Sequence, residues 1–303
     1  MSRLLRNGLI LLALNAWVIV YLRTKPPVES TFRWKRTTME RHHADCDVLV
    51  LGSSHALYGI RPDYLTPHAL NMALASQDTH YDWETLKKWG PELPRLKMVV
   101  QVLGPEMLLF ELDNSCEEWR SDFYLAELNL PPGHWTIGRR LKSVLPRLAF
   151  DETATQQSPK MIAEFRRSVT DQGWFRTTPE VITREAAKLT VNRHRLDDQP
   201  AAISGNVLDR IQDVSNWCRE HDVLCVYVNP PHHPFYREQT DPQKLRVCLK
   251  FLREVAKKNG ALWIDEFASE AYGDGDYHDP DHLSEQGAAK LSRRVGEKIR
   301  PLL

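Results

Sequence analysis

A serine and a histidine near opposite ends of the chain indicate the chemistry of this sequence. Ser54 follows an apolar run, residues 48–51, and Gly52, which permits a sharp turn at the end of a buried strand. His282 lies near the C-terminus, three residues after Asp279. A serine hydroxyl is a weak nucleophile until a base accepts its proton, and a third group must fix the tautomer of that base. We therefore predict that Ser54 is a nucleophile, His282 its base and Asp279 the group that orients the base.

Asp281 is a second candidate for the orienting carboxylate. It is adjacent to His282 in the sequence, and the side chains of adjacent residues point apart. A spacing of three residues, in a turn that leads into a helix, instead lets the Asp279 carboxylate fold back onto the imidazole Nδ1. We therefore favour Asp279. If Ser54 had no chemical role, it would cap the helix that follows it.

The order of apolar segments predicts how these residues meet. Strand-like runs alternate with helical segments, which is typical of a parallel sheet covered by helices on both faces. Because ligands bind at the carboxyl ends of such strands, Ser54 and His282 are expected to converge there. The predicted strands are residues 46–51, 69–72, 97–103, 223–229 and 261–267, and the predicted helices are 79–89, 207–221, 242–259 and 284–299.

A long segment, residues 106–205, separates the third and fourth predicted strands without clear strand signals. A connection of this length far exceeds the usual few residues, so we predict a helical cap insertion. Three patches in it have helical character, 136–148, 159–169 and 179–191. Its tryptophans, Trp119, Trp135 and Trp174, either pack the core of the cap or form a surface on which sugars stack.

The N-terminus has the pattern of a membrane segment. Residues 7–22 are almost entirely apolar; Arg3 and Arg6 precede them, and Arg23 and Lys25 follow. Counted from Leu4, the segment is close to the ~20 residues that span a bilayer. No small-residue cleavage motif follows, which favours a single-pass signal anchor over residues 1–24 above a cleaved signal peptide or a buried helix. Residues 25–44 are polar and are expected to form a stalk. The remaining domain, 45–303, is then expected on the extracytoplasmic, periplasmic side of the inner (cytoplasmic) membrane.

Composition limits the remaining function classes. The chain has 303 residues, of which 42% are hydrophobic, enough for one large α/β domain with an insertion. Forty basic residues balance forty acidic ones, so no nucleic-acid partner is expected. No cofactor and no metal site are predicted, because the candidate ligands fit no known ligand motif: His232, His233, His278, Asp279 and His282.

Three short motifs resemble the SGNH/GDSL hydrolases. Gly52-Ser53-Ser54 followed by Gly59 resembles the first block of that family, Asn71-Met72-Ala73 the second, and Asp279–Leu283 followed by Gly287 the last. The resemblance covers about residues 45–110 and 205–303. It implies a flavodoxin-like three-layer fold and catalytic roles for Ser54, Asp279 and His282. It also places the oxyanion donors at the backbone N–H of Ser54 and of Ala73 or a neighbour.

The sequence departs from the family pattern in three places. Ser53 stands where the family has an acidic residue, and Ala73 stands where it has glycine, with Ser76 three positions further on. Gly104-Pro105-Glu106 replaces the third block, so the side-chain oxyanion donor of that block is missing. The loss of one such donor typically costs about 10²–10³ in rate. Asn71 is the expected substitute.

Four further residues are expected at the active edge because they follow predicted strands or the nucleophile. These are His55, Glu106, His232 and His233. We predict that they contact substrate. The alternatives are a packed or solvent-facing histidine at position 55 and an ion pair with the cap at Glu106.

The N-terminal segment and the Gly-Ser-Ser motif together resemble membrane-anchored SGNH-like proteins of bacterial cell-envelope O-acylation. Such proteins work beside membrane-bound O-acyltransferases. The resemblance implies an acetyltransferase or esterase that acts on a cell-envelope glycan or exopolysaccharide through an acyl-Ser54 intermediate. The alternative is an inactive SGNH-like scaffold that binds polysaccharide or an acyltransferase partner.

Overall fold

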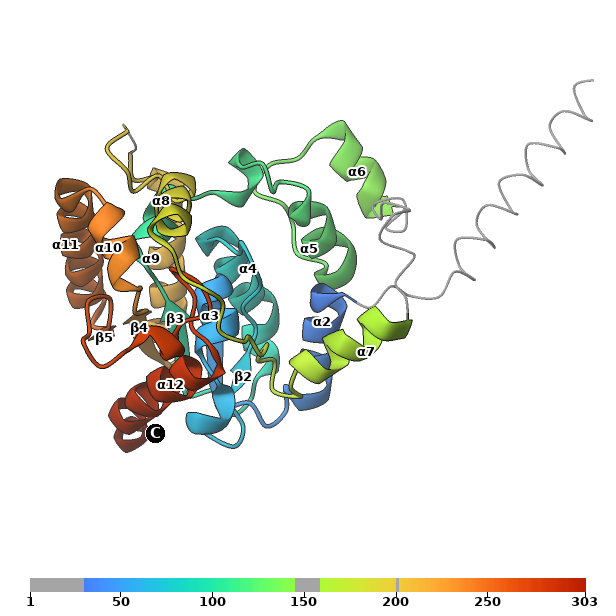
Figure 1. The fold of residues 1–303 in the computed structure, drawn as a ribbon. Helices are drawn as coiled ribbons and strands as arrows, with labels where there is room; N and C mark the ends of the chain where they lie inside the picture. Colours follow the sequence, from blue (N-terminus) through green and yellow to red (C-terminus); the bar gives the residue numbers. More distant parts are fainter. Residues whose placement is uncertain (1–29, 145–158, 200–201) are drawn as a thin grey trace, which may run out of the picture.

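The computed structural model describes residues 30–144, 159–199 and 202–303 (Figure 1). Its centre is a five-stranded sheet in the order β2-β1-β3-β4-β5, in which every pair of neighbours is parallel. This is the flavodoxin-like order, as predicted. The strands are Val48–Gly52 (β1), Leu70–Asn71 (β2), Met98–Val102 (β3), Leu224–Asn229 (β4) and Leu262–Asp265 (β5).

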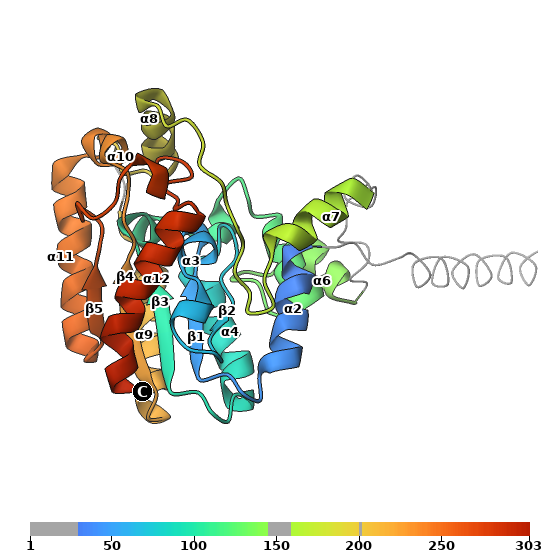
Figure 2. The same cartoon turned by 60° about the horizontal axis from the view of Figure 1, so that its bottom comes forward.

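Helices cover both faces of the sheet and complete the three layers (Figure 2). One face packs against α3 and α12, and the other against α4, α9 and α11. The helices are Thr31–His42 (α2), Ser54–Gly59 (α3), Thr79–Trp89 (α4), Arg120–Leu128 (α5), Ile137–Val144 (α6), Pro159–Ser168 (α7), Arg184–Arg193 (α8), Gly205–Glu220 (α9), Pro234–Gln239 (α10), Pro242–Asn259 (α11) and Glu285–Ile299 (α12).

The central strands are buried on both faces, which explains their continuous apolar runs. Successive side chains of a strand point to opposite faces. In β1, Val48 and Val50 pack toward α3 and α12, whereas Leu49 and Leu51 pack toward α4 and α9. The predicted strands therefore match the observed ones to within a few residues at their ends.

The start of α12 fixes the loop that carries His282. The Ser284 hydroxyl accepts a hydrogen bond from the N–H of Gly287, as an N-cap residue does. A Cβ atom at Gly287 would lie only 1.9 Å from the carbonyl oxygen of Asp276. A glycine at this position thus lets α12 begin close against the preceding loop.

Part of the expected stalk belongs to the folded domain, which corrects the prediction for residues 25–44. Residues 31–42 form α2, and Phe32, Lys35 and Met39 on it are buried. The Lys35 ammonium donates hydrogen bonds to the carbonyl oxygens of Asn71 and Gly173, both at 2.6 Å. Composition suggested a polar stalk, whereas the three-to-four-residue spacing of the buried side chains is that of one helix face.

The described parts of the insertion, residues 106–144, 159–199 and 202–205, contain α5, α6, α7 and α8, but the tryptophans of the insertion do not pack a common cap core. Trp174 is buried, and its indole N–H donates to the carbonyl oxygen of Tyr58 in the main domain at 2.7 Å. Trp119 and Trp135 are 49% and 44% exposed. The insertion also packs along the main domain at both ends, because α5 contacts α2 and α8 contacts α10.

The predicted signal anchor, residues 1–24, lies outside the described residues. Among the helices in the described part of the chain, none combines the length and the apolar character that crossing a membrane requires.

Candidate active site

A glycine turn at the end of β1 presents Ser54. Gly52 has φ +134°, and a Cβ atom there would lie 3.0 Å from the carbonyl oxygen of Val102 and 3.1 Å from the Cβ of Ala56. Only glycine adopts such a backbone conformation without strain. The Ser53 hydroxyl accepts from the N–H of His55 and caps α3. Ser54 therefore sits half-buried in the first turn of α3, at the carboxyl edge of the sheet.

Ser54, His282 and Asp279 form a continuous chain of hydrogen bonds. The Ser54 Oγ lies 2.7 Å from His282 Nε2, and His282 Nδ1 lies 2.8 Å from Asp279 Oδ2. The other Asp279 oxygen accepts from the backbone N–H of His282 at 2.8 Å and of Asp281 at 3.0 Å. Because the carboxylate accepts the Nδ1 proton, Nε2 is left to accept the proton of Ser54.

Asp281 lies beside the same imidazole as a second, buried carboxylate. It is 1% exposed, and its Oδ1 is 3.5 Å from His282 Nδ1. Its Oδ2 faces the Nε2 atoms of His55 at 3.4 Å and of His194 at 3.5 Å. The expectation that Asp281 points away from His282 is therefore wrong, although Asp279 makes the shorter contact. The turn brings both carboxylates to one side of the ring.

The two carboxylates make His282 more basic. Burial by itself lowers its pKa, but the charge of Asp281 and the hydrogen bond of Asp279 outweigh burial and raise the pKa to about 9. Burial raises the pKa of Asp281, yet the adjacent imidazoles of His282 and His55 hold that pKa well below its ordinary value. The fraction of His282 that can accept a proton from Ser54 therefore increases with pH and reaches one half at a pH of about 9.

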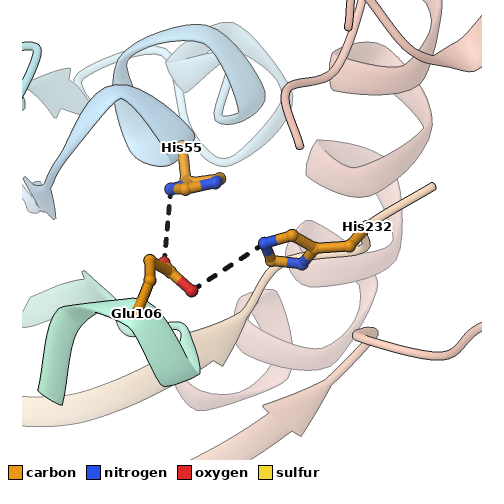
Figure 3. Close-up of side chains that lie close together, drawn as sticks. All are labelled: His55, Glu106 and His232. Carbon is orange, nitrogen blue, oxygen red and sulfur yellow. Dashed lines mark ion pairs between the residues drawn. The ribbon is translucent and has the colours of Figure 1, made fainter. Parts of the chain in front are cut away.

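The side chains of three predicted substrate contacts, His55, Glu106 and His232, lie close together (Figure 3). They are buried beside the triad. Their exposed fractions are 5%, 5% and 0%. His55 Nδ1 is 3.3 Å from Glu106 Oε1, and His232 Nε2 is 3.8 Å from Glu106 Oε2. The His55 ring also stacks on the ring of His282, with centroids 4.9 Å apart. These residues form a layer behind the base. This geometry does not favour the prediction that they contact substrate.

His233 lies apart from that layer. Its Nε2 is 3.2 Å from Oδ1 of the exposed Asp274, and its Nδ1 accepts from the N–H of Phe235 at the start of α10. His233 caps α10, next to the loop that carries the base. This role accounts for its polar contacts, and no substrate is needed to explain them.

The predicted oxyanion donors are engaged within the protein, with one exception. The Asn71 side-chain amide donates to the carbonyl oxygens of Ala56 at 2.7 Å and Ile60 at 2.9 Å. The N–H of Ala73 donates to Asn71 Oδ1 at 3.0 Å. The hydroxyl of Ser76 bonds to the Glu117 carboxylate. Asn71 therefore holds α3 in place, and the backbone N–H of Ser54 is the predicted donor that remains for a substrate oxyanion.

Two residues near the base were not predicted from the sequence. His194 follows α8 in the insertion; its Nδ1 is 2.8 Å from the Tyr236 hydroxyl, and burial lowers its pKa to about 3. His194 does not follow a predicted strand, so its position in the sequence did not indicate that it lies at the active edge. The Tyr58 ring packs edge-on against His282, with centroids 5.3 Å apart. Its spacing of four residues from Ser54 on a helix was the signal that could have placed it on the same face.

Comparisons with known proteins give distant similarities. No family model and no curated protein matches the chain. Among solved structures, a GDSL-like lipase from Bacteroides thetaiotaomicron VPI-5482 aligns with 90% of this chain and 100% of its own, at 10% identity and a TM-score of 0.45. A lipase/acylhydrolase from Enterococcus faecalis aligns over 85% of this chain and 97% of its own, at 12% identity and a TM-score of 0.41.

Proposed function

We propose that this protein is a serine acyl-ester enzyme that works through an acyl-Ser54 intermediate. One observation carries the proposal, namely the unbroken chain from Ser54 Oγ to His282 Nε2 and from His282 Nδ1 to Asp279, at 2.7 and 2.8 Å. Both distances are within the reach required for proton transfer between a nucleophile, its base and an orienting group. Ser54 is also half-buried at the carboxyl edge of the sheet, where α/β folds bind ligands.

The reaction proceeds in two steps through one base. Ser54 Oγ attacks the ester carbonyl carbon while its proton passes to His282 Nε2, and the alcohol leaves with that proton. Water or a sugar hydroxyl then attacks the acyl-serine, its proton passes to the same nitrogen, and the Ser54 hydroxyl is restored. Hydrolysis and transfer differ only in this second acceptor.

Turnover of a chromogenic acetyl ester by the purified chain tests the assignment. Ser54→Ala is expected to lower kcat by about 10³-fold or more, because activity then depends on the remaining binding and oxyanion groups alone. Ser168→Ala, at the end of α7, is the matched control and should retain the wild-type rate. Equal activity of wild type and Ser54→Ala would remove Ser54 from the mechanism.

Covalent capture tests the intermediate separately. A fluorophosphonate should add one adduct mass to the wild-type chain, at Ser54 by peptide mass spectrometry. The label should be absent from Ser54→Ala and slowed in His282→Ala. Labelling at another serine would assign the nucleophile elsewhere.

For the biological substrate, we propose an O-acetylated cell-envelope glycan or exopolysaccharide at the outer face of the inner membrane, beside a membrane-bound O-acyltransferase. The apolar residues 4–22 and the family resemblance of the sequence support this proposal. Alkaline phosphatase fused to the C-terminus should be active if the domain is exported. An inactive phosphatase fusion with an active cytoplasmic reporter at the same site would contradict the location.

A specific observation also favours a second candidate, a scaffold with the same fold. Two of the predicted oxyanion donors, Asn71 and Ala73, are bonded to the protein itself. A scaffold would bind polysaccharide or an acyltransferase partner without ester turnover. The absence of both turnover and fluorophosphonate labelling, together with saturable polysaccharide binding, would favour this candidate over the enzyme.

A further inference from the structure

We propose that His55, Glu106 and His232 form a binding site for a divalent transition-metal ion such as Zn²⁺, directly behind the triad. Two imidazoles and one carboxylate are a donor set that binds zinc in proteins. The three residues come from separate elements: α3, the short helix Pro105–Leu109 and the loop after β4 (Figure 3). Of these three residues, only His232 was among the candidate metal ligands named from the sequence.

The separations of the ligand atoms fit one ion. One donor atom from each residue lies within 4.8 Å of the others. Ligands held about 2.0–2.2 Å from a tetrahedral ion are about 3.4 Å apart. The contact of His55 Nδ1 with Glu106 Oε1 is 3.3 Å, and that of His232 Nε2 with Glu106 Oε2 is 3.8 Å.

The hydrogen bonds of His232 direct a lone pair at Glu106. A carbonyl oxygen only accepts, so the 3.1 Å contact between His232 Nδ1 and the carbonyl of Pro230 places the proton on Nδ1. The neutral ring then presents an unprotonated Nε2 to a carboxylate 3.8 Å away. Two acceptors that face each other in the interior repel, and a cation between them removes the repulsion.

His55 has the complementary arrangement. Its Nε2 faces Asp281 Oδ2 at 3.4 Å, while Nδ1 faces Glu106, with the Ser53 hydroxyl 3.2 Å from the same Nδ1. A proton on Nε2 toward Asp281 leaves the Nδ1 lone pair for the ion. Carboxylate–histidine–metal and carbonyl–histidine–metal contacts of this kind orient the ligands of metal sites. Both histidines thus have an oxygen beside the nitrogen that faces away from the site, in a hydrogen bond at His232 Nδ1 and at ion-pair distance at His55 Nε2.

The Glu106 carboxylate supplies independent evidence for a ligand. It is buried, and among the described residues neither of its oxygens has a hydrogen-bond partner. The His232 Nε2 atom is likewise buried without such a partner in this part of the chain. Native proteins satisfy nearly all buried polar side-chain atoms, so three orphan atoms that converge on one point indicate a missing group. A bound cation would satisfy all three.

Zinc titration of the tag-free, full-length chain tests the site. After removal of metal with a chelator, Zn²⁺ alone is titrated in competition with a chromophoric chelator. The wild type should bind one ion per chain. Second-shell partners typically contribute about 10–100-fold to affinity, so Glu106→Gln, which removes a direct ligand, should weaken binding by more than that.

Two further variants define the result. His232→Gln should weaken binding as Glu106→Gln does, which protects the test if one of the two fails to fold by circular dichroism. His233→Ala removes the neighbouring histidine, whose ring contacts Asp274 instead, and should leave the affinity unchanged. Co²⁺ bound to the wild type should show the intense visible absorption of a four-coordinate site, and Glu106→Gln should lose it.

The outcomes separate this proposal from the proposed function. Ser54→Ala should bind zinc like the wild type, because Ser54 is not a ligand, even where it abolishes ester turnover. Absence of saturable zinc binding by the wild type would overturn the metal site and leave the serine mechanism intact. Equal affinity of the wild type, Glu106→Gln and His232→Gln would place any bound zinc elsewhere and also overturn it.

Discussion

Replacement of Asp281 by asparagine should move the pH dependence of catalysis to lower pH. Asp281 Oδ1 lies 3.5 Å from His282 Nδ1, and its charge contributes to raising the pKa of His282 from 6.5 to about 9. The asparagine would keep the size of the side chain and remove the charge. The protonated imidazole then loses a stabilising neighbour, so His282 releases its proton at lower pH. The expected sign is a decrease in the pKa of His282.

The size of the decrease can be bounded from the geometry. Two unit charges 3.5 Å apart interact by about 5 kcal/mol at an effective dielectric constant of about 20, equivalent to about 3.5 pH units. This is an upper limit, because 3.5 Å separates the nearest atoms, whereas the carboxylate and the imidazolium each spread their charge over several atoms. The hydrogen bond of Asp279, which also raises the pKa, remains in the variant. We therefore expect a decrease of about 1–2 pH units.

The assay is the pH profile of kcat/KM for an acetyl ester, which reports the ionisation of the base in the free enzyme. Chelator in every buffer keeps the charge of a bound metal out of the comparison. Asp274→Asn is the matched control, because it removes an exposed carboxylate that contacts His233 and should leave the midpoint unchanged. If turnover of Asp281→Asn is too slow, the Cε1 proton resonance of His282 gives the same pKa. An unchanged or raised midpoint in Asp281→Asn would refute the electrostatic role of Asp281.

Three further substitutions test the supports of the triad. Asp279→Asn should lower kcat by about 10³–10⁴-fold, because the amide favours the wrong tautomer of His282; a rate within tenfold of wild type would exclude Asp279 as the orienting group. Gly52→Ala should lower the free energy of unfolding by about 1–3 kcal/mol in urea denaturation, because it strains the φ of +134° and crowds the Val102 carbonyl; an unchanged midpoint would contradict this. Asn71→Ala removes the side-chain donor to the carbonyls of Ala56 and Ile60 and the acceptor of the Ala73 N–H, and should cost about 2–4 kcal/mol by the same measurement; a loss below 1 kcal/mol would show that water replaces the amide.

Local sequence patterns were sufficient to predict the strands, the turn and the sheet edge that position the site. The run 48–51 followed by Gly52 predicted a buried strand and a turn, and the alternation of strands and helices predicted a parallel sheet. In such a sheet the residues after the strands meet at one edge, which placed Ser54 near the loop of His282. The spacing of Asp279 from His282 is short enough for the local turn to decide their contact.

The direction in which side chains point at that edge depends on packing that the sequence does not display. Glu106 was placed correctly after β3, yet its carboxylate turns inward over Gly104, where a Cβ atom would lie 2.2 Å from Oε1. His232 turns inward because its Nδ1 bonds to the carbonyl of Pro230. Likewise, α2 is helical because its buried face packs on the domain, whereas its composition alone suggested a polar stalk. Tertiary contacts therefore decided the features that were missed.

The expected catalytic strength depends on two opposing features of the site. The chain from Ser54 through His282 to Asp279 is complete, which favours formation of an acyl-serine. The Asn71 amide and the Ala73 N–H are bonded within the protein, and each missing oxyanion donor costs about 10²–10³ in rate. We therefore expect slow, Ser54-dependent turnover of simple acetyl esters in steady-state assays. Turnover as fast as that of efficient general esterases would contradict this expectation. It would mean that Asn71 or Ala73 gives up its internal hydrogen bond and donates to the substrate oxyanion. These two are the predicted donors that could act together with the N–H of Ser54.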